Sequence, residues 1–278
     1  MSADRWSDRL RTSMQSRRSL VCVGIDPDLT KMPGPLRAIT DVETQLLRFA
    51  EGIIAATSDI ACAYKPNMGF FLAHGAPGIR ALEQLRSRIP AETPAILDAK
   101  IGDIGTTAAA YARGVYETLG YDAVTLSPYL GEDTLVPFIS RPDRGVFILC
   151  KTSNPGSGDL QDLEIDGTPL YRVVAGKIRD WSSRHPATLG LVVGATYPEQ
   201  LAAVRVSCPH QPILLPGVGA QAGDLEAAVR AGVNADGFGL VVTSSRGIIY
   251  ASSGDDWQDA ARAAATDLRD AVNAIRGV

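Results

Sequence analysis

Residues 96–112, ILDAKIGDIGTTAAAYA, place an apolar run, a group of charges and a helical pattern next to one another. The apolar run is typical of a buried strand, and it ends at Asp98 and Lys100. Asp103 lies in the turn that follows, and residues 106–119 are predicted to form a helix. A strand followed by a helix is the repeating unit of a parallel sheet whose faces are covered by helices.

The same unit recurs along the whole chain. Apolar runs that end in polar or Gly-rich turns occupy residues 19–26, 59–67, 94–100, 122–128, 145–156, 189–196, 212–219 and 235–247. Helical patterns lie between them, and no G-x-G-x-x-G motif opens the first helix, which argues against an open dinucleotide-binding sheet. The sequence therefore predicts an α/β fold of the (β/α)8 TIM-barrel type, built as a single domain over residues 1–278.

The chain begins with a segment that precedes the first strand. Trp6, Leu10 and Met14 recur every four residues, which predicts an amphipathic lead-in helix. Asp4 and Asp8 argue against a transit peptide in this region.

Composition narrows the class of protein. The 278 residues include 27 Lys and Arg against 31 Asp and Glu, a net charge of −4 that gives no sign of nucleic-acid binding. No apolar run approaches the length of a membrane span. The four cysteines are widely separated, so they are expected to be reduced, buried thiols. These features favour a cytoplasmic enzyme that binds neither nucleic acid nor membrane.

Charged residues stand where predicted strands end. Asp26 ends the first strand, Lys65 the second, Asp98 and Lys100 the third, and Lys151 the fifth. Side chains alternate along a strand, so Asp98 and Lys100 point the same way. In a TIM barrel the carboxyl ends of the strands form the active-site face. A salt-bridge cluster that closes the barrel is the structural alternative, but residues on three successive strands favour a site.

Such a network suits a particular chemistry. An ammonium held between carboxylates stays protonated and can act as a general acid, while a fixed carboxylate disfavours another negative charge beside it. That pairing fits the loss of a substrate carboxylate followed by protonation of the carbanion. The sequence has no HxH, HExxH or Cys/His cluster, so no metal site is expected.

The opposite side of the predicted barrel mouth suits a phosphate. PGVGAQAGD follows the seventh strand and SSRG follows the eighth, the positions where such barrels commonly hold phosphate. Gly217 and Gly219 let the backbone approach closely, Gln221 can donate through its amide, and Arg246 can bind two phosphate oxygens.

These motifs together resemble a known family. D-x-K-x-x-D at Asp98, Lys100 and Asp103, KPN from Lys65 and PGVGAQ from Pro216 are similar to orotidine 5′-monophosphate decarboxylases. The strings GIDPDL, AYKPN, SPYLGED and CKTSNPG resemble the longer bacterial subgroup, type 2, of that family. The resemblance runs from about residue 20 to residue 250.

The resemblance implies roles for individual residues at the reacting centre. Lys100 is expected to protonate C6 of the pyrimidine as CO₂ leaves, and Asp98 to face the leaving carboxylate. Asp26 and Lys65 are expected to hold the ribose hydroxyls. No metal or organic cofactor is expected, because positioned charges supply the catalysis.

The remaining roles implied by the resemblance concern binding and assembly. Ser153 is expected to bond the amide edge of the pyrimidine, and Gln221 and Arg246 to hold the phosphate. Asp103 and Thr107 are expected to reach into the site of a neighbouring subunit, which makes a homodimer necessary for activity. The substrate is then orotidine 5′-monophosphate.

Three alternatives stay open. A magnesium-dependent decarboxylase or synthase of a keto-sugar phosphate shares D-x-K-x-x-D, but Lys65 stands where it needs a Glu for the metal. A Schiff-base lyase is disfavoured because lysines beside carboxylates stay charged. A non-catalytic nucleotide-binding protein is the third.

Residues 154–170, rich in Gly and Asp, are predicted to be a loop at the barrel mouth.

Overall fold

The computed structural model describes residues 5–218 and 224–278. Its central sheet consists of eight strands, all paired in parallel. The strands are β1 (Val21–Ile25), β2 (Ala63–Pro66), β3 (Ile96–Ile101), β4 (Ala123–Leu126), β5 (Gly145–Lys151), β8 (Thr188–Val193), β9 (Ile213–Pro216) and β10 (Leu240–Ser244). Each lies within one of the eight predicted apolar runs or one residue beyond it.

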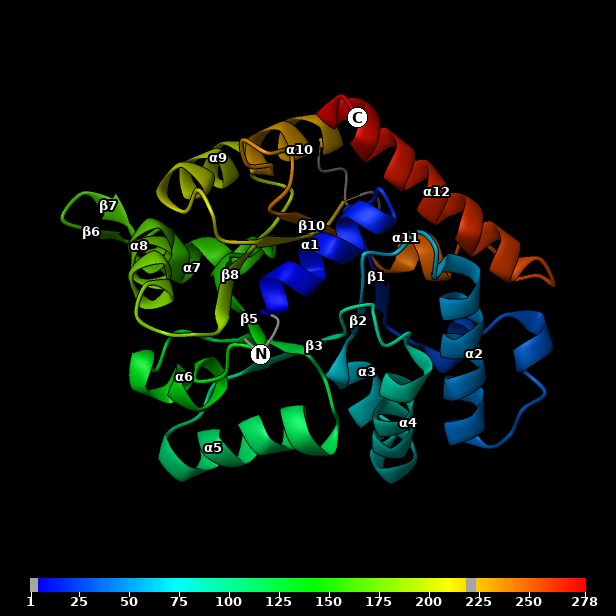
Figure 1. The fold of residues 1–278 in the computed structure, drawn as a ribbon. Coiled ribbons are helices and arrows are strands. Elements are labelled where there is room, and N and C mark those ends of the chain that lie inside the picture. Colours follow the sequence, from blue (N-terminus) through cyan, green and yellow to red (C-terminus); the bar gives the residue numbers. More distant parts are fainter. Residues whose placement is uncertain (1–4, 219–223) are drawn as a thin grey trace.

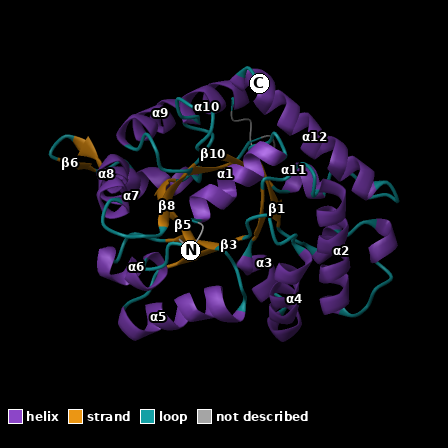
Figure 2. Cartoon of the chain, viewed as in Figure 1, coloured by secondary structure: helices purple, strands orange, loops and turns teal. Residues whose placement is uncertain are grey.

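The sheet closes into a barrel. Its strand order is β2–β1–β10–β9–β8–β5–β4–β3, and single bridges from Tyr64 to Ala95 and from Asn67 to Asp98 join the two end strands. Figures 1 and 2 show the strands at the centre of a ring of helices. The predicted (β/α)8 barrel is therefore confirmed, and all eight strands deliver their carboxyl ends to the same face.

The helices follow the strands in the expected alternation. They are α1 (Trp6–Ser16), α2 (Val42–Thr57), α3 (Met68–Leu72), α4 (Gly75–Arg88), α5 (Gly105–Arg113), α6 (Glu132–Ile139), α7 (Gly158–Gln161), α8 (Leu170–Ser182), α9 (Pro198–Ser207), α10 (Leu225–Gly232), α11 (Arg246–Ile249) and α12 (Trp257–Arg276). Among the described helices, none combines the length and apolar character needed to cross a membrane.

Helix α1 covers the amino-terminal end of the barrel (Figure 1). Its residues Trp6, Leu10 and Met14 are buried, which confirms the predicted lead-in helix. The Trp6 ring packs edge-on against Phe147 with 5.6 Å between centroids. It also fills the space beside Gly145, where a Cβ atom would lie 2.6 Å from the indole. The open face at the other end is therefore left for the functional site.

Two predictions of local structure need correction. Residues 154–170 are not a plain loop: they contain a 3₁₀ turn (Pro155–Ser157), α7, and a hairpin of β6 (Glu164–Ile165) and β7 (Thr168–Pro169) that projects from the barrel (Figure 1). The predicted helix over 106–119 starts at Gly105 and ends as α5 at Arg113, after which Gly114–Thr118 widens into a π-helical turn. The four cysteines are buried and unpaired, as predicted.

Candidate active site

The carboxyl ends of the strands enclose a cavity of about 220 Å³. Six of the residues predicted from the sequence line it together: Asp26, Lys65, Asp98, Ser153, Gly217 and Arg246. They come from β1, β2 and β3 on one side and from the ends of β5, β9 and β10 on the other. Closure of the barrel thus brings positions up to 220 residues apart in the sequence into one site.

Asp98 is the centre of a charge network. Lys65 Nζ donates to Asp98 Oδ2 at 2.7 Å, and Lys100 Nζ donates to Asp98 Oδ1 at 2.6 Å. Lys65 and Asp98 are only 4% and 9% exposed, so water weakens their attraction little. The predicted succession of alternating charges, Asp26, Lys65, Asp98 and Lys100, is present in space as well as in sequence.

The two carboxylates of the network have opposite pKa shifts. Burial would raise the pKa of Asp98, but Lys65 and Lys100 outweigh it and hold that pKa well below the usual value. Burial raises the pKa of Asp26, and the opposing attraction of Lys65 does not cancel it. Burial alone would lower the pKa of Lys65, yet Asp98 and Asp26 together raise it. Lys65 and Asp98 are therefore charged at neutral pH.

Lys100 stands at an irregular point of β3. It has a φ of +49°, and the pairing of β3 with β4 changes register between Leu97 and Ile101. A left-handed backbone costs a non-glycine residue roughly 1–2 kcal/mol. Its side chain is half exposed and lines a neighbouring cavity with Asn67 and Tyr111, and Asp98 borders both cavities. Lys100 therefore approaches the site from the side of α3 and α5.

The structure shows which of the two lysines is held between carboxylates. Within the described chain Lys65, not Lys100, lies between two carboxylates, because Asp26 and Asp98 both act on it. Asp103 does not reach Lys100; its Oδ1 accepts the backbone N–H of Ile104. Thr107 is exposed on α5 and lines an apolar surface hollow with Met68 and Tyr111. Asp103 and Thr107 thus lie outside the cavity that Asp26 and Lys65 line.

The side of the cavity predicted to bind phosphate is formed by the ends of β9 and β10. Gly217 has a φ of +95°, a conformation that side chains disfavour, and it turns the backbone into the cavity wall. Arg246, the first residue of α11, is exposed at the rim. Gly219 and Gln221, also predicted to bind here, lie outside the described residues.

Ser153 follows β5 and is supported by a strap of residues 154–163. Lys151 is 1% exposed, and its Nζ donates to both carboxylate oxygens of Asp162, at 2.6 and 2.8 Å. The side-chain oxygen of Gln161 accepts the backbone N–H of Thr152 at 2.9 Å. The charged end of the fifth strand, Lys151, therefore anchors the strap that borders the site, instead of joining the Asp26–Lys100 network.

Sequence reasoning assigned no individual role to several polar residues of the site, among them Asn67, Thr125 and Thr243. Asn67 lines both cavities, and Thr243 lines the main cavity with a buried Oγ1 that has no hydrogen-bond partner among the described residues. Thr125, 1% exposed on β4, donates to Asp98 Oδ1 at 3.0 Å. A threonine at an inward position of an otherwise apolar strand was the available signal for Thr125 and Thr243.

The side chains of the site are poorly suited to bind a divalent metal ion. Within residues 5–218 and 224–278, no group of three or more His, Cys, Asp or Glu side chains is arranged to hold a metal ion. Lys65 occupies the side of Asp98 where a divalent cation would need a second carboxylate.

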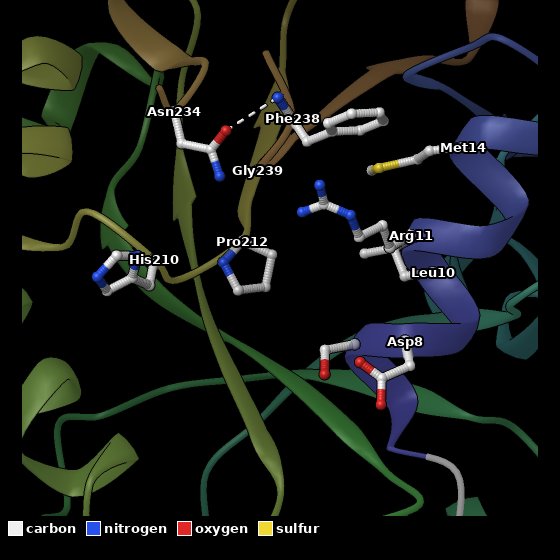
Figure 3. Close-up of a pocket in the computed structure, with 10 residues that line it drawn as sticks. Asp8, Leu10, Arg11, Met14, His210, Pro212, Asn234, Phe238 and Gly239 are labelled. Atoms are coloured by element: carbon white, nitrogen blue, oxygen red, sulfur yellow. Dashed lines mark hydrogen bonds between the residues drawn. The ribbon is translucent and has the colours of Figure 1, made fainter. Parts of the chain in front are cut away.

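A second cavity, of about 190 Å³, lies at the opposite end of the barrel (Figure 3). It is bounded by α1 and by residues that precede β9 and β10, including Pro212 and Phe238. The guanidinium of Arg11 packs 4.7 Å from the centre of the Phe238 ring and pairs with Asp236 at 3.3 Å. Because the cavity lies at the amino ends of the strands and the Arg11 guanidinium in it is already paired with Asp236, it belongs to the packing of α1.

Comparisons with known proteins agree with the geometry. A protein of Roseiflexus castenholzii named orotidine 5′-phosphate decarboxylase is 55% identical over 269 residues, which cover 96% of this chain and 97% of that protein. One of the same name from Thermomicrobium roseum is 50% identical over 271 residues, covering 97% and 95%. The solved structure of Leishmania donovani OMP decarboxylase superposes with a TM-score of 0.86 at 40% identity, covering 99% of both chains.

The sequence model of one family matches most of the chain, from residue 19 to residue 263. The match includes the strand ends that carry Asp26, Lys65, Asp98, Lys100 and Arg246. The chain belongs to the orotidine 5′-phosphate decarboxylase / HUMPS family.

Proposed function

We propose that this protein decarboxylates orotidine 5′-monophosphate to UMP and CO₂, the last step of de novo pyrimidine biosynthesis. The observation that carries the proposal is the ion-paired set Lys65–Asp98–Lys100 at the mouth of the barrel. The relatives at 50% and 55% identity carry the name of this activity.

The cavity accommodates the substrate in one direction. Arg246 and the backbone at Gly217 bind the phosphate, with Gly219 and Gln221, a few residues further along the sequence, as additional partners. Asp26 and Lys65 bind the ribose hydroxyls. The buried Oδ1 of Asp26 has no hydrogen-bond partner among the described residues and is an acceptor for one of these hydroxyls. Ser153, across the cavity, bonds the amide edge of the pyrimidine. Binding energy from the phosphate and ribose holds the reacting carbon against Asp98.

The reaction then follows from the charges. The substrate carboxylate lies beside the anionic Asp98, where like charges disfavour it. The C6–CO₂ bond breaks, CO₂ leaves, and the electron pair stays on C6. Lys100 Nζ gives its proton to C6 and regains one from solvent. Lys65, held positive by Asp26 and Asp98, stabilises the developing negative charge without giving up a proton. This route uses no metal or organic cofactor.

The active assembly is proposed to be a homodimer in which Asp103 and Thr107 complete the neighbouring site. Thr107 lies on an exposed face beside large apolar side chains: Leu72, Ile104 and Tyr111 are 54%, 62% and 43% exposed. Apolar groups gathered on one face in this way are typical of protein–protein contacts. The face borders the cavity that Lys100 lines, so a partner there is close to the reacting centre.

The remaining assignments concern domain organisation, subgroup and compartment. We propose that residues 1–278 act as one domain, that the subgroup is the longer bacterial type, and that the protein works in the cytoplasm. Four buried, unpaired cysteines support a reducing compartment.

Loss of the ultraviolet absorbance of orotidine 5′-monophosphate tests this function. Turnover that EDTA leaves unchanged, with UMP as product, is the expected result. Turnover of a keto-sugar phosphate that EDTA abolishes would reassign the chain to the metal-dependent alternative, and binding of UMP without any turnover would reassign it to the non-catalytic one.

A further inference from the structure

Strand β3 carries more residues than its neighbour can pair. Leu97 is opposite Val124 and Ile101 is opposite Leu126, so Asp98, Ala99 and Lys100 face the single residue Thr125. The backbone N–H groups of Ala99 and Lys100, within this bulge, are directed at the Thr125 side chain instead of a regular ladder of carbonyl groups. A polar group left unpaired at such a place is costly, and a bulge without a fixed partner leaves its side chains poorly aimed.

The side chain of Thr125 fills the gap. Its Oγ1 accepts the backbone N–H of Ala99 at 2.9 Å and that of Lys100 at 2.9 Å. Its own O–H donates to Asp98 Oδ1 at 3.0 Å. A hydroxyl has one donor and two acceptor positions, so all three are used, and all three go to consecutive residues of one bulge.

These contacts fix the direction in which the Thr125 hydroxyl donates its proton. Because both acceptor positions face backbone N–H groups, the proton of Thr125 is directed at Asp98 Oδ1. The same carboxylate oxygen accepts Lys100 Nζ at 2.6 Å. One buried side chain thus sets the backbone of Lys100, the orientation of the Asp98 carboxylate and the contact between the two.

We propose that Thr125 is a positioning residue for decarboxylation: its hydroxyl holds the β3 bulge in the conformation that directs the Lys100 and Asp98 side chains at the reacting carbon. The proposal rests on the proposed function and extends it to a residue that need not touch the substrate. A merely structural threonine would affect stability alone, whereas a positioning threonine affects the chemical step more than binding.

Two isosteric or near-isosteric changes separate these roles. Thr125→Val removes the hydroxyl and keeps the shape, and Thr125→Ser keeps the hydroxyl. Thr57→Val is the matched control, because Thr57 is also fully buried and hydrogen-bonded, to Ile53 O and Tyr64 OH, but lies at the end of α2 away from the site. We expect Thr125→Val to lower kcat about 10- to 100-fold, the loss that corresponds to a hydrogen bond to a charged group.

The other readouts sharpen the comparison. UMP affinity of Thr125→Val should change less than about threefold, because Asp26 follows β1 and Arg246 begins α11, away from the β3 bulge. Thr125→Ser and Thr57→Val should keep kcat within about threefold of the wild type. Should the valine variant fail to fold, Thr125→Ser against Thr125→Ala makes the same comparison.

Amide hydrogen exchange at Ala99 and Lys100 provides a test that needs no turnover. Exchange should be at least about tenfold faster in Thr125→Val than in the wild type and unchanged in Thr57→Val. Unchanged exchange, a kcat equal to that of Thr57→Val, or a serine variant as impaired as the valine variant would each overturn the proposal. Faster exchange in Thr125→Val, combined with a wild-type protein that does not decarboxylate orotidine 5′-monophosphate, would instead refute the proposed function and leave the role of Thr125 in the bulge intact.

Discussion

Asp26 and Asp98 are chemically identical carboxylates with opposite pKa shifts in one cavity. Asp98 accepts from Lys65, Lys100 and Thr125, and so its ionised form is favoured despite burial. Asp26 keeps a buried Oδ1 without a partner in the described chain, and burial raises its pKa. A polar group that the fold leaves unsatisfied marks the place where a substrate hydroxyl can bind.

The raised pKa of Asp26 predicts that this carboxylate lowers the stability of the folded protein at neutral pH while it serves substrate binding. A folded-state pKa above the unfolded value, near 4, means that the folded protein prefers protonated Asp26, so ionisation at neutral pH costs folding free energy. Asp26→Asn should therefore raise Tm at pH 7.5 by about 2 °C or more while lowering activity.

The gain should shrink as pH falls through the folded pKa of Asp26, because the wild type then loses the charge as well. Differential scanning calorimetry at several pH values measures it, with the exposed Asp255→Asn as control. A lower Tm for Asp26→Asn at pH 7.5 would show that ionised Asp26 stabilises the fold.

At the scale of elements, the strap of residues 154–163 depends on one asymmetric ion pair. The side chain of Lys151 is 2% exposed and that of Asp162 is 51% exposed. Removing Asp162 leaves the buried ammonium without a counter-charge, with the Ser157 hydroxyl 3.4 Å away as its remaining hydrogen-bond partner among the described residues. Removing Lys151 leaves a carboxylate that water can solvate. Asp162→Ala should cost about 2 kcal/mol and lower Tm by roughly 5 °C, and Lys151→Met should lower Tm by less than about 2 °C.

Thermal melts of the two variants check this, with Asp159→Ala as the matched control because Asp159 is exposed on the same strap. Equal losses for Asp162→Ala and Lys151→Met would mean that the ammonium gains water or another partner when Asp162 is removed.

Elements differed in how well the sequence could predict them. The eight strands were predictable because a strand buried on both faces needs a nearly unbroken apolar run. The hairpin of Glu164–Ile165 and Thr168–Pro169 was not, since strands of two residues leave no periodic pattern. The bulge at Lys100 was also missed, because register depends on which residue of the neighbouring strand pairs with it.

At the scale of the molecule, barrel closure explains why the site could be assembled from sequence at all. Once eight strand–helix units are recognised, all strand ends must meet at one face. The sequence alone therefore predicts that Asp26, Lys65, Asp98 and Arg246 lie together. Thr125 escaped notice because its role lies in contacts with the backbone of a neighbouring strand.

The proposed dimer predicts that two inactive chains can restore activity. Lys100→Ala and Asp103→Ala chains should each be inactive alone. If Asp103 acts in the neighbouring site, a mixed dimer has one site with both residues intact. Random reassortment then restores up to about one quarter of wild-type activity, since about half the dimers are mixed. Mixed dimers seen by native mass spectrometry without recovered activity would place Asp103 in its own subunit's site.

The proposed reaction depends most on Lys100 as the proton donor, and kcat of the Lys100→Ala variant on orotidine 5′-monophosphate tests that role most directly. Tm and UMP affinity should confirm that the variant is folded and binds. We predict a loss in kcat of at least about 1,000-fold, with EDTA leaving the wild-type rate unchanged. A folded Lys100→Ala variant that keeps kcat within about tenfold of the wild type would contradict the account.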